Sequence, residues 1–114
     1  MKLPRPLEAA VDAAKSKLAQ DLVVLDVQES ASFTDYFLLA SGSSQRQVIA
    51  IVDAVLEVLR AAGVRPDHVE GYPRQEWILL DYGGFIVHVF TPRQRSFYDL
   101  ERLWGQARRW EVPE

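Results

Sequence analysis

The stretch E-W-I-L-L-D-Y-G-G-F-I-V-H-V-F, residues Glu76–Phe90, is the longest apolar segment of the chain, and Gly83-Gly84 divides it in two. Two strand-like runs separated by a Gly-Gly pair are typical of a β-hairpin, because a tight hairpin turn needs positive φ. Side chains with polar atoms interrupt the apolar runs at Trp77, Asp81, Tyr82 and His88. We expect any functional site to involve these residues.

A two-residue turn at Gly83-Gly84 also decides which residues share a face, since side chains alternate along a strand. One face then holds only apolar and aromatic residues, and we expect helices to cover it: Ile78, Leu80, Tyr82, Phe85, Val87 and Val89. The opposite face, here called the mixed face, holds Trp77, Leu79, Asp81, Ile86, His88 and Phe90. On it, His88 should lie diagonal to Asp81, at about 7–8 Å.

The mixed face admits two interpretations. A large aromatic side chain with a few polar groups on an apolar background is typical of a protein-binding hot spot. The same composition also suits a second, wetter core layer under another helix, in which Trp77 fills space. The residue pattern leaves both interpretations open.

The elements before the hairpin follow from periodicity and end signals. Pro4 and Pro6 open a helix, and apolar runs at 22–27 and 35–40 predict strands. The second run is apolar on both faces, as in a central strand. Ser44 and Gln47 form a capping box that starts a further helix, which ends at Gly63, and a short strand is expected near 68–70.

After the hairpin, Thr91 is the expected N-cap of a last helix whose apolar stripe is Phe97, Leu100 and Trp104. Residues 106–114 are polar and are expected to form a frayed tail, which leaves a single domain over residues 1–105. The sequence therefore predicts an α/β fold with a mixed sheet of four to five strands and flanking helices.

Composition narrows the function classes. The chain has 114 residues, a net charge of −3, no cysteine and two histidines. These values argue against nonspecific nucleic-acid binding, thiol chemistry and a structural zinc site. The N-terminus lacks a secretory signal, and no apolar run reaches the roughly 20 residues that span a bilayer, so we expect a cytoplasmic protein without membrane contact.

Sites for catalysis are weakly supported. Gly42-Ser43-Ser44 could hold a phosphate, but a simple helix N-cap explains it better. A two-metal site would need scattered carboxylates, and a serine nucleophile lacks the Gly-x-Ser-x-Gly turn. The residues considered for these sites are Asp26, Asp35, Ser41, Ser43, Glu70, Asp81 and His88.

Arginines are concentrated in the C-terminal region, where they suit a solvated helix face better than an RNA-binding patch. They are Arg93, Arg95, Arg102, Arg108 and Arg109. We expect no enzyme, metal or cofactor.

Several segments together resemble the ribosomal silencing factor (Iojap) family. They are L-D-V at 25–27, F-T-D-Y-F-L-L-A-S-G-S-S-Q-R-Q-V-I-A-I at 33–51, E-G-Y at 70–72, W-I-L-L-D-Y-G-G-F-I-V-H-V-F at 77–90 and R-S-F-Y-D-L-E-R-L-W at 95–104. The joint pattern is specific, although no single segment is.

The resemblance implies a non-enzymatic factor that binds the large ribosomal subunit through ribosomal protein number fourteen. It would block subunit joining and lower translation when nutrients are scarce, and it would be a homodimer when free. The implied fold is related to nucleotidyltransferases but lacks their catalytic carboxylates. The implied docking residues here are Trp77, Leu79, Asp81, Tyr82 and His88. A large-subunit assembly factor and a nucleotide-binding protein are the alternatives.

The chain departs from the family pattern at two positions. The family turn is usually Gly-Asp, whereas this chain has Gly83-Gly84, and Gln94 stands where glutamate is common. If the acid contacts a basic partner, that interaction is missing here.

Overall fold

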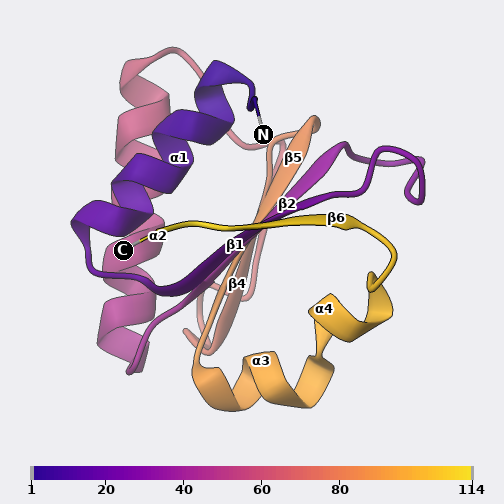
Figure 1. The fold of residues 1–114 in the computed structure, drawn as a ribbon. Helices are drawn as coiled ribbons and strands as arrows, with labels where there is room; N and C mark the ends of the chain where they lie inside the picture. Colours follow the sequence, from indigo (N-terminus) through magenta and orange to yellow (C-terminus); the bar gives the residue numbers. More distant parts are fainter. Residues whose placement is uncertain (1, 114) are drawn as a thin grey trace.

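The computed structural model describes residues 2–113. Helices and strands follow one another as α1 (Arg5–Ser16), β1 (Gln20–Asp26), β2 (Tyr36–Ser41), α2 (Gln45–Ala61), β3 (His68–Glu70), β4 (Trp77–Asp81), β5 (Phe85–Phe90), α3 (Pro92–Tyr98), α4 (Leu100–Leu103) and β6 (Arg108–Glu111). The strands form one sheet in the order β3-β4-β5-β2-β1-β6. The fold is thus a mixed α/β fold with helices on both faces of the sheet (Figure 1).

The sheet is mixed because β2 and β5 pair in parallel while the other neighbours pair antiparallel. The helix α2 lies between β2 and β5 in the chain and forms part of the long connection that a parallel pair of strands requires. β2 has β5 on one side and β1 on the other, which confirms it as a central strand. The predicted short strand at 68–70 is β3, at one edge of the sheet.

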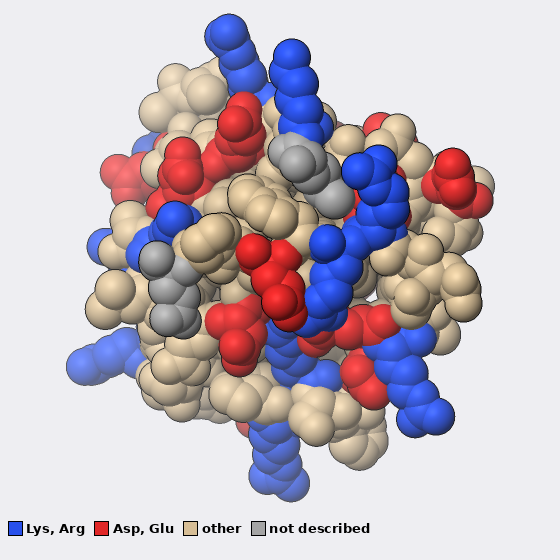
Figure 2. Space-filling view, viewed as in Figure 1, with Lys and Arg blue, Asp and Glu red and all other residues tan. Residues whose placement is uncertain are grey.

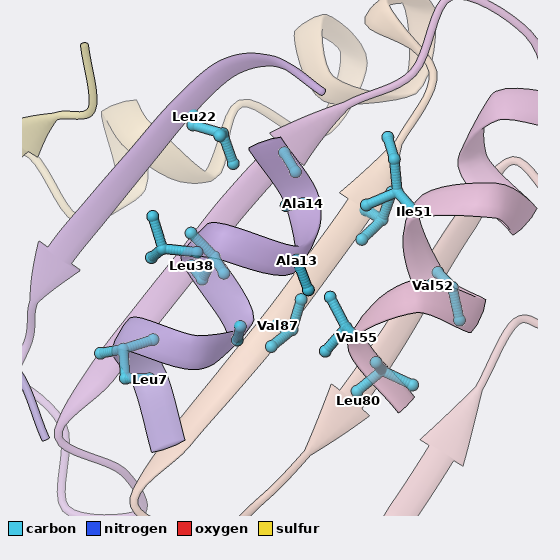
Figure 3. Close-up of a cluster of buried hydrophobic side chains, with 14 of the residues drawn as sticks. Leu7, Ala13, Ala14, Leu22, Leu38, Ile51, Val52, Val55, Leu80 and Val87 are labelled. Carbon is cyan, nitrogen blue, oxygen red and sulfur yellow. The ribbon is translucent and has the colours of Figure 1, made fainter. Parts of the chain in front are cut away.

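Helices α1 and α2 cover one face and enclose the main hydrophobic core (Figure 1). Figure 3 shows Leu38, Leu80 and Val87 of the sheet clustered with Leu7 of α1 and Val55 of α2. All these side chains are fully buried. The face predicted to lie beneath helices is therefore the one that α1 and α2 cover.

The start of α2 is held by the predicted cap. The Ser44 side chain accepts a hydrogen bond from the Gln47 backbone N–H at 3.1 Å. Gly42 precedes it where a Cβ atom would lie 2.8 Å from the backbone nitrogen of Val48. Glycine is thus needed here because the strand end approaches the helix closely.

The prediction of four to five strands is wrong, because the sheet has six. The frayed tail is also wrong for Arg108–Glu111, which form β6 and pair antiparallel with β1. Trp110 explains the difference, since it is partly buried and packs against the main core. The Val112 N–H also donates to the Leu22 carbonyl at 2.9 Å. A relationship to nucleotidyltransferases stays a prediction.

The last helix is interrupted where an unbroken one was expected. Asp99 adopts a left-handed conformation with φ 45°, which ends α3 and redirects the chain into α4. Leu100 and Trp104 pack against the sheet, but Phe97 is 78% exposed. The predicted stripe of these residues is therefore correct only for its second half.

Candidate docking surface

The hairpin of β4 and β5 has the predicted register. Trp77 pairs with Phe90, Leu79 with His88, and Asp81 with Ile86. Gly83 alone of the two turn glycines has a positive φ, +86°, and its N–H donates to Asp81 Oδ1 at 2.8 Å. The turn thus needs one glycine for its backbone conformation, with Asp81 holding it from the preceding strand.

Trp77 and His88 form a hydrogen-bonded pair on the mixed face. The Trp77 indole Nε1–H donates to His88 Nδ1 at 3.1 Å. His88 is 5% exposed, and burial lowers its pKa to about 4. The imidazole is therefore neutral at pH 7, and because Nδ1 accepts, the proton resides on Nε2. Within residues 2–113, Nε2 has no hydrogen-bond partner.

Aromatic rings surround this pair. The Trp77 ring lies 4.4 Å from the Tyr98 ring of α3 and 5.9 Å from that of Phe90, between centroids. The Phe37 ring lies 5.1 Å from His88 and 5.4 Å from Trp104, both edge-on. The centre of the mixed face is thus a second core, whose buried members are Val23, Leu25, Val27, Phe37, Leu39, Ile86 and Phe90.

An exposed apolar border accompanies this second core. We call it the apolar rim; its residues are Phe33, Phe97, Tyr98 and Leu103, which are 59%, 78%, 48% and 72% exposed. Phe33 contacts the Trp104 ring at 6.2 Å, and Tyr98 contacts Trp77. The core interpretation is thus confirmed for the centre of the mixed face. The docking interpretation stays a prediction, and the exposed apolar border is the candidate surface for it.

The structure brings Trp77, Leu79, Asp81 and His88 together on one face, with the first three only partly buried. Tyr82 lies on the opposite face, where it packs against the main core and stacks on Phe85 at 5.0 Å. Burial raises the pKa of Tyr82 to about 12. Tyr82 therefore does not share a surface with Trp77.

The apolar rim was missed by reasoning from the sequence. Its signal is the run Ser96-Phe97-Tyr98, since adjacent aromatic residues on a helix cannot both face the sheet. The helical spacing assigns Phe97 to the buried stripe, because it predicts a helix that continues unbroken through Asp99. The two adjacent aromatic residues predict that one of them is exposed, but they do not predict which side of the helix faces solvent.

The groups considered for catalysis have other partners. Ser41 Oγ accepts from Arg95 Nη1 at 2.9 Å, and Asp81 holds the Gly83 N–H. The N–H and hydroxyl of Ser43 both donate to Gln47 Oε1, so these two donors at the start of the helix already have a partner within the chain.

In the described part of the chain, no cluster of three or more His, Asp or Glu residues could hold a metal ion. Over the same residues, no helix combines the length and apolar character needed to cross a bilayer.

Known proteins resemble this chain over nearly its whole length. The family model described as "Ribosomal silencing factor during starvation" matches residues 1–114. The ribosomal silencing factor of Bacillus subtilis is 38% identical over 101 residues, which cover 89% of this chain and 86% of that protein. The mouse protein named "Mitochondrial assembly of ribosomal large subunit protein 1" is 30% identical over 86% of this chain and 44% of its own length.

The fold agrees with the sequence matches. A crystal structure of a Chromobacterium violaceum protein superposes with a TM-score of 0.87 at 33% identity, covering all of this chain and 92% of the other. The match of the whole chain to the family model and the similarity to curated silencing factors agree with the resemblance noted in the sequence. The chain belongs to the ribosomal silencing factor family, which includes the Iojap proteins.

Proposed function

We propose that this protein represses translation in the cytoplasm by binding the large ribosomal subunit and blocking the small subunit sterically. In this proposal the contact is made to ribosomal protein number fourteen, at the intersubunit face, when nutrients are limiting. The protein is a homodimer when it is off the ribosome. The observation that carries the proposal is the apolar rim beside Trp77, because a chain of this family exposes here the side chains that a docking contact needs.

The composition of the rim supports a protein partner. Phe97 and Leu103 are more than two-thirds exposed, and neither is needed to fill the second core. Aromatic residues are enriched at interface hot spots, where a few side chains carry most of the binding free energy. The Trp77 ring, on the sheet, packs against the Tyr98 ring and holds it in place. The rim thus makes direct contact, and Trp77 supports it.

Asp81 adds a charge beside this surface. Its Oδ1 atom accepts from the Gly83 N–H, whereas Oδ2 accepts no hydrogen bond from residues 2–113. The second oxygen can therefore meet a basic group on the partner. Because Asp81 is only partly buried, this ion pair would add specificity more than affinity.

The test is co-sedimentation of purified large subunits with the Phe97→Ala variant. Truncation of a central aromatic contact typically costs about 2 kcal/mol, so affinity should fall roughly 30-fold. Val58→Ala is the matched control, since Val58 is an exposed apolar residue (42%) on α2, which covers the other face. Undiminished binding by folded Phe97→Ala and Leu103→Ala variants would refute the docking surface.

A role in assembly of the large subunit is the second candidate, and the name of the mouse relative favours it. Both roles use the same surface, so the Phe97→Ala variant does not separate them. A joining assay with mature, purified subunits does. Silencing predicts that the wild-type protein prevents formation of the joined ribosome, whereas a pure assembly factor leaves joining unchanged.

A further inference from the structure

A groove with a volume of about 680 Å³ opens between the turn after α1, the C-terminal residues and the α3–α4 segment. Its apolar wall includes Leu18, Ala19, Leu22 and Val112. None of the apolar rim residues lines it. The volume lies within the range of pockets that hold small molecules. Figure 2 faces this side of the molecule and shows acidic and basic side chains interleaved near the middle of the view.

The backbone at the edge of the groove is strained. Leu18 and Asp21 have positive φ angles of 59° and 49°, a region that a bulky side chain such as leucine rarely adopts. Side chains from distant segments fix both: Gln47 Nε2 donates to the Leu18 carbonyl at 3.0 Å, and Arg95 Nη1 donates to the Asp21 carbonyl at 2.6 Å. Strain that is held in this way is often found at ligand-binding sites. It also leaves the Leu18 side chain 79% exposed beside the groove.

Two guanidinium groups share one carboxylate at the polar side of the groove. Arg95 Nε donates to Glu101 Oε1 at 2.9 Å, and Arg109 Nη1 donates to Glu101 Oε2. Burial alone would raise the pKa of Glu101, but hydrogen bonds from Arg95 and Arg109 outweigh it and lower that pKa. Arg95 is only 11% exposed, and its Nη2 atom has no hydrogen-bond partner among residues 2–113. The partly buried Arg95 guanidinium thus keeps donor capacity in a side chain that lines the groove.

The other partner of Arg109 is easily replaced. Arg109 Nη2 donates to Glu111 Oε1 at 3.1 Å, but the Glu111 side chain is 74% exposed. Exposed ion pairs of this kind contribute little to stability, so a ligand can take the place of Glu111 without leaving Arg109 unpaired. The groove therefore holds carboxylates already, one of them exchangeable.

We propose that this groove binds a small organic acid with an aliphatic body. Its carboxylate takes the place of Glu111 on Arg109 and accepts from Nη2 of Arg95, while Lys15 adds a positive charge at the groove. The aliphatic body covers Leu18 and the apolar wall, which removes exposed apolar surface from water. An inorganic anion would gain nothing from this wall, so the geometry favours an organic carboxylate over free phosphate. The proposal is independent of ribosome binding.

The test is a titration of the ¹⁵N-labelled protein with sodium hexanoate at pH 7, followed by backbone amide shifts. Hexanamide and inorganic phosphate are the comparison probes. We expect saturable shifts at Leu18, Ala19 and Val112 with hexanoate. Hexanamide should bind at least about tenfold more weakly, as the loss of one hydrogen bond to a charged group implies. Phosphate should bind at least about tenfold more weakly because it has no aliphatic body to cover the apolar wall. No saturation with hexanoate, or equal binding of hexanamide or phosphate, would overturn the proposal.

Two groove variants and one control variant separate the groove from nonspecific anion binding. Arg109→Gln should weaken hexanoate binding about tenfold, whereas Arg60→Gln on α2, outside the groove, should not change it. Glu111→Gln removes the internal competitor and should tighten binding severalfold, and because Glu111 is exposed the variant should fold normally. Unchanged or weaker binding by Glu111→Gln, or unchanged binding by Arg109→Gln, would refute the assignment.

Discussion

The two faces of the sheet are closed in different ways. Helices α1 and α2 cover one face and contribute fully buried residues along their length. The short helices α3 and α4 cover the other face without one buried residue of their own. Their contacts come from partly buried side chains such as Leu100 and Trp104. The helices α1 and α2 therefore cover the first face of the sheet, whereas the cover of the second face leaves apolar side chains exposed.

The difference lies in the length and continuity of the covering helices. The helix α2 repeats apolar residues at helical spacing over 17 residues, so its apolar stripe matches the sheet throughout. The α3–α4 segment turns at Asp99 after seven helical residues, which directs Phe97 and Leu103 toward solvent. Beneath this short, broken cover lies a buried layer, and its outer side exposes the apolar side chains of the proposed docking surface. In that proposal, stability and docking depend on different faces of the sheet.

The largest expected effect is a difference in stability between truncations at two neighbouring residues of β4, one on each face of the sheet. Leu80 is fully buried beneath α2, and Leu79 is only partly buried on the mixed face. Leu80→Ala should lower the free energy of unfolding by about 3 kcal/mol, because it leaves a cavity, and Leu79→Ala by about 1 kcal/mol. Urea denaturation of both variants measures this difference. Equal losses would mean that the mixed face is as closed as the other.

The second prediction concerns the pH dependence of stability. The pKa of His88 is about 4 in the folded protein, below its ordinary value of 6.5, because burial penalises the charged form. The unfolded chain therefore binds more protons between these values, and stability should fall as the pH drops from about 6.5 to about 4. The full loss from this group is roughly 3 kcal/mol. Below pH 4 its contribution stays constant.

Denaturation at a series of pH values checks this prediction. His88→Gln keeps an acceptor for the Trp77 indole N–H and should remove this part of the pH dependence. His68→Gln is the matched control, since the His68 side chain is 60% exposed, and it should retain the dependence. A His88→Gln protein with the parent's pH profile would show that the centre of the mixed face admits water.

The register of the hairpin was predictable because two local signals agree on it. Alternation of side chains assigns Ile78 and Leu80 to one face, and the turn at Gly83-Gly84 fixes the pairing with β5. The prediction that Trp77, Leu79, Asp81 and His88 share a face follows from this register alone. The family resemblance then implies a docking role for these residues, which the residue pattern alone leaves open and which stays a prediction.

Other features depend on contacts between distant segments. β6 contains Arg108, Arg109 and Glu111, which are polar and exposed, so only Trp110 signals burial. Its pairing with β1 joins residues far apart in the chain, which no local pattern encodes. The apolar rim depends on the left-handed conformation of Asp99, a residue that tolerates this conformation without requiring it. The groove likewise forms only once α1, β1, α3, α4 and β6 have come together, because its lining residues come from all five elements.

The smallest expected effect concerns the turn that assigns the hairpin residues to their faces. Gly83 has a φ of +86°, so Gly83→Ala should cost about 1 kcal/mol through backbone strain, although the space for a Cβ is sufficient. Gly84 lacks a positive φ in the left-handed range, and nothing lies within 4 Å of its Cβ position. Gly84→Asp, which restores the turn of the family pattern, should therefore change stability by less than about 0.5 kcal/mol.

Thermal and urea denaturation of the two variants test this asymmetry. A large loss for Gly84→Asp would contradict the turn geometry and, with it, the register that separates the faces. If Gly84→Asp is neutral for stability, its co-sedimentation with large subunits becomes informative. An acid at 84 would lie in the turn between β4, which ends at Asp81, and β5. Tighter binding would therefore place a basic group of the partner beside the turn and extend the docking surface beyond the apolar rim. Unchanged binding would confine the contact to the rim and explain why this chain can carry glycine there.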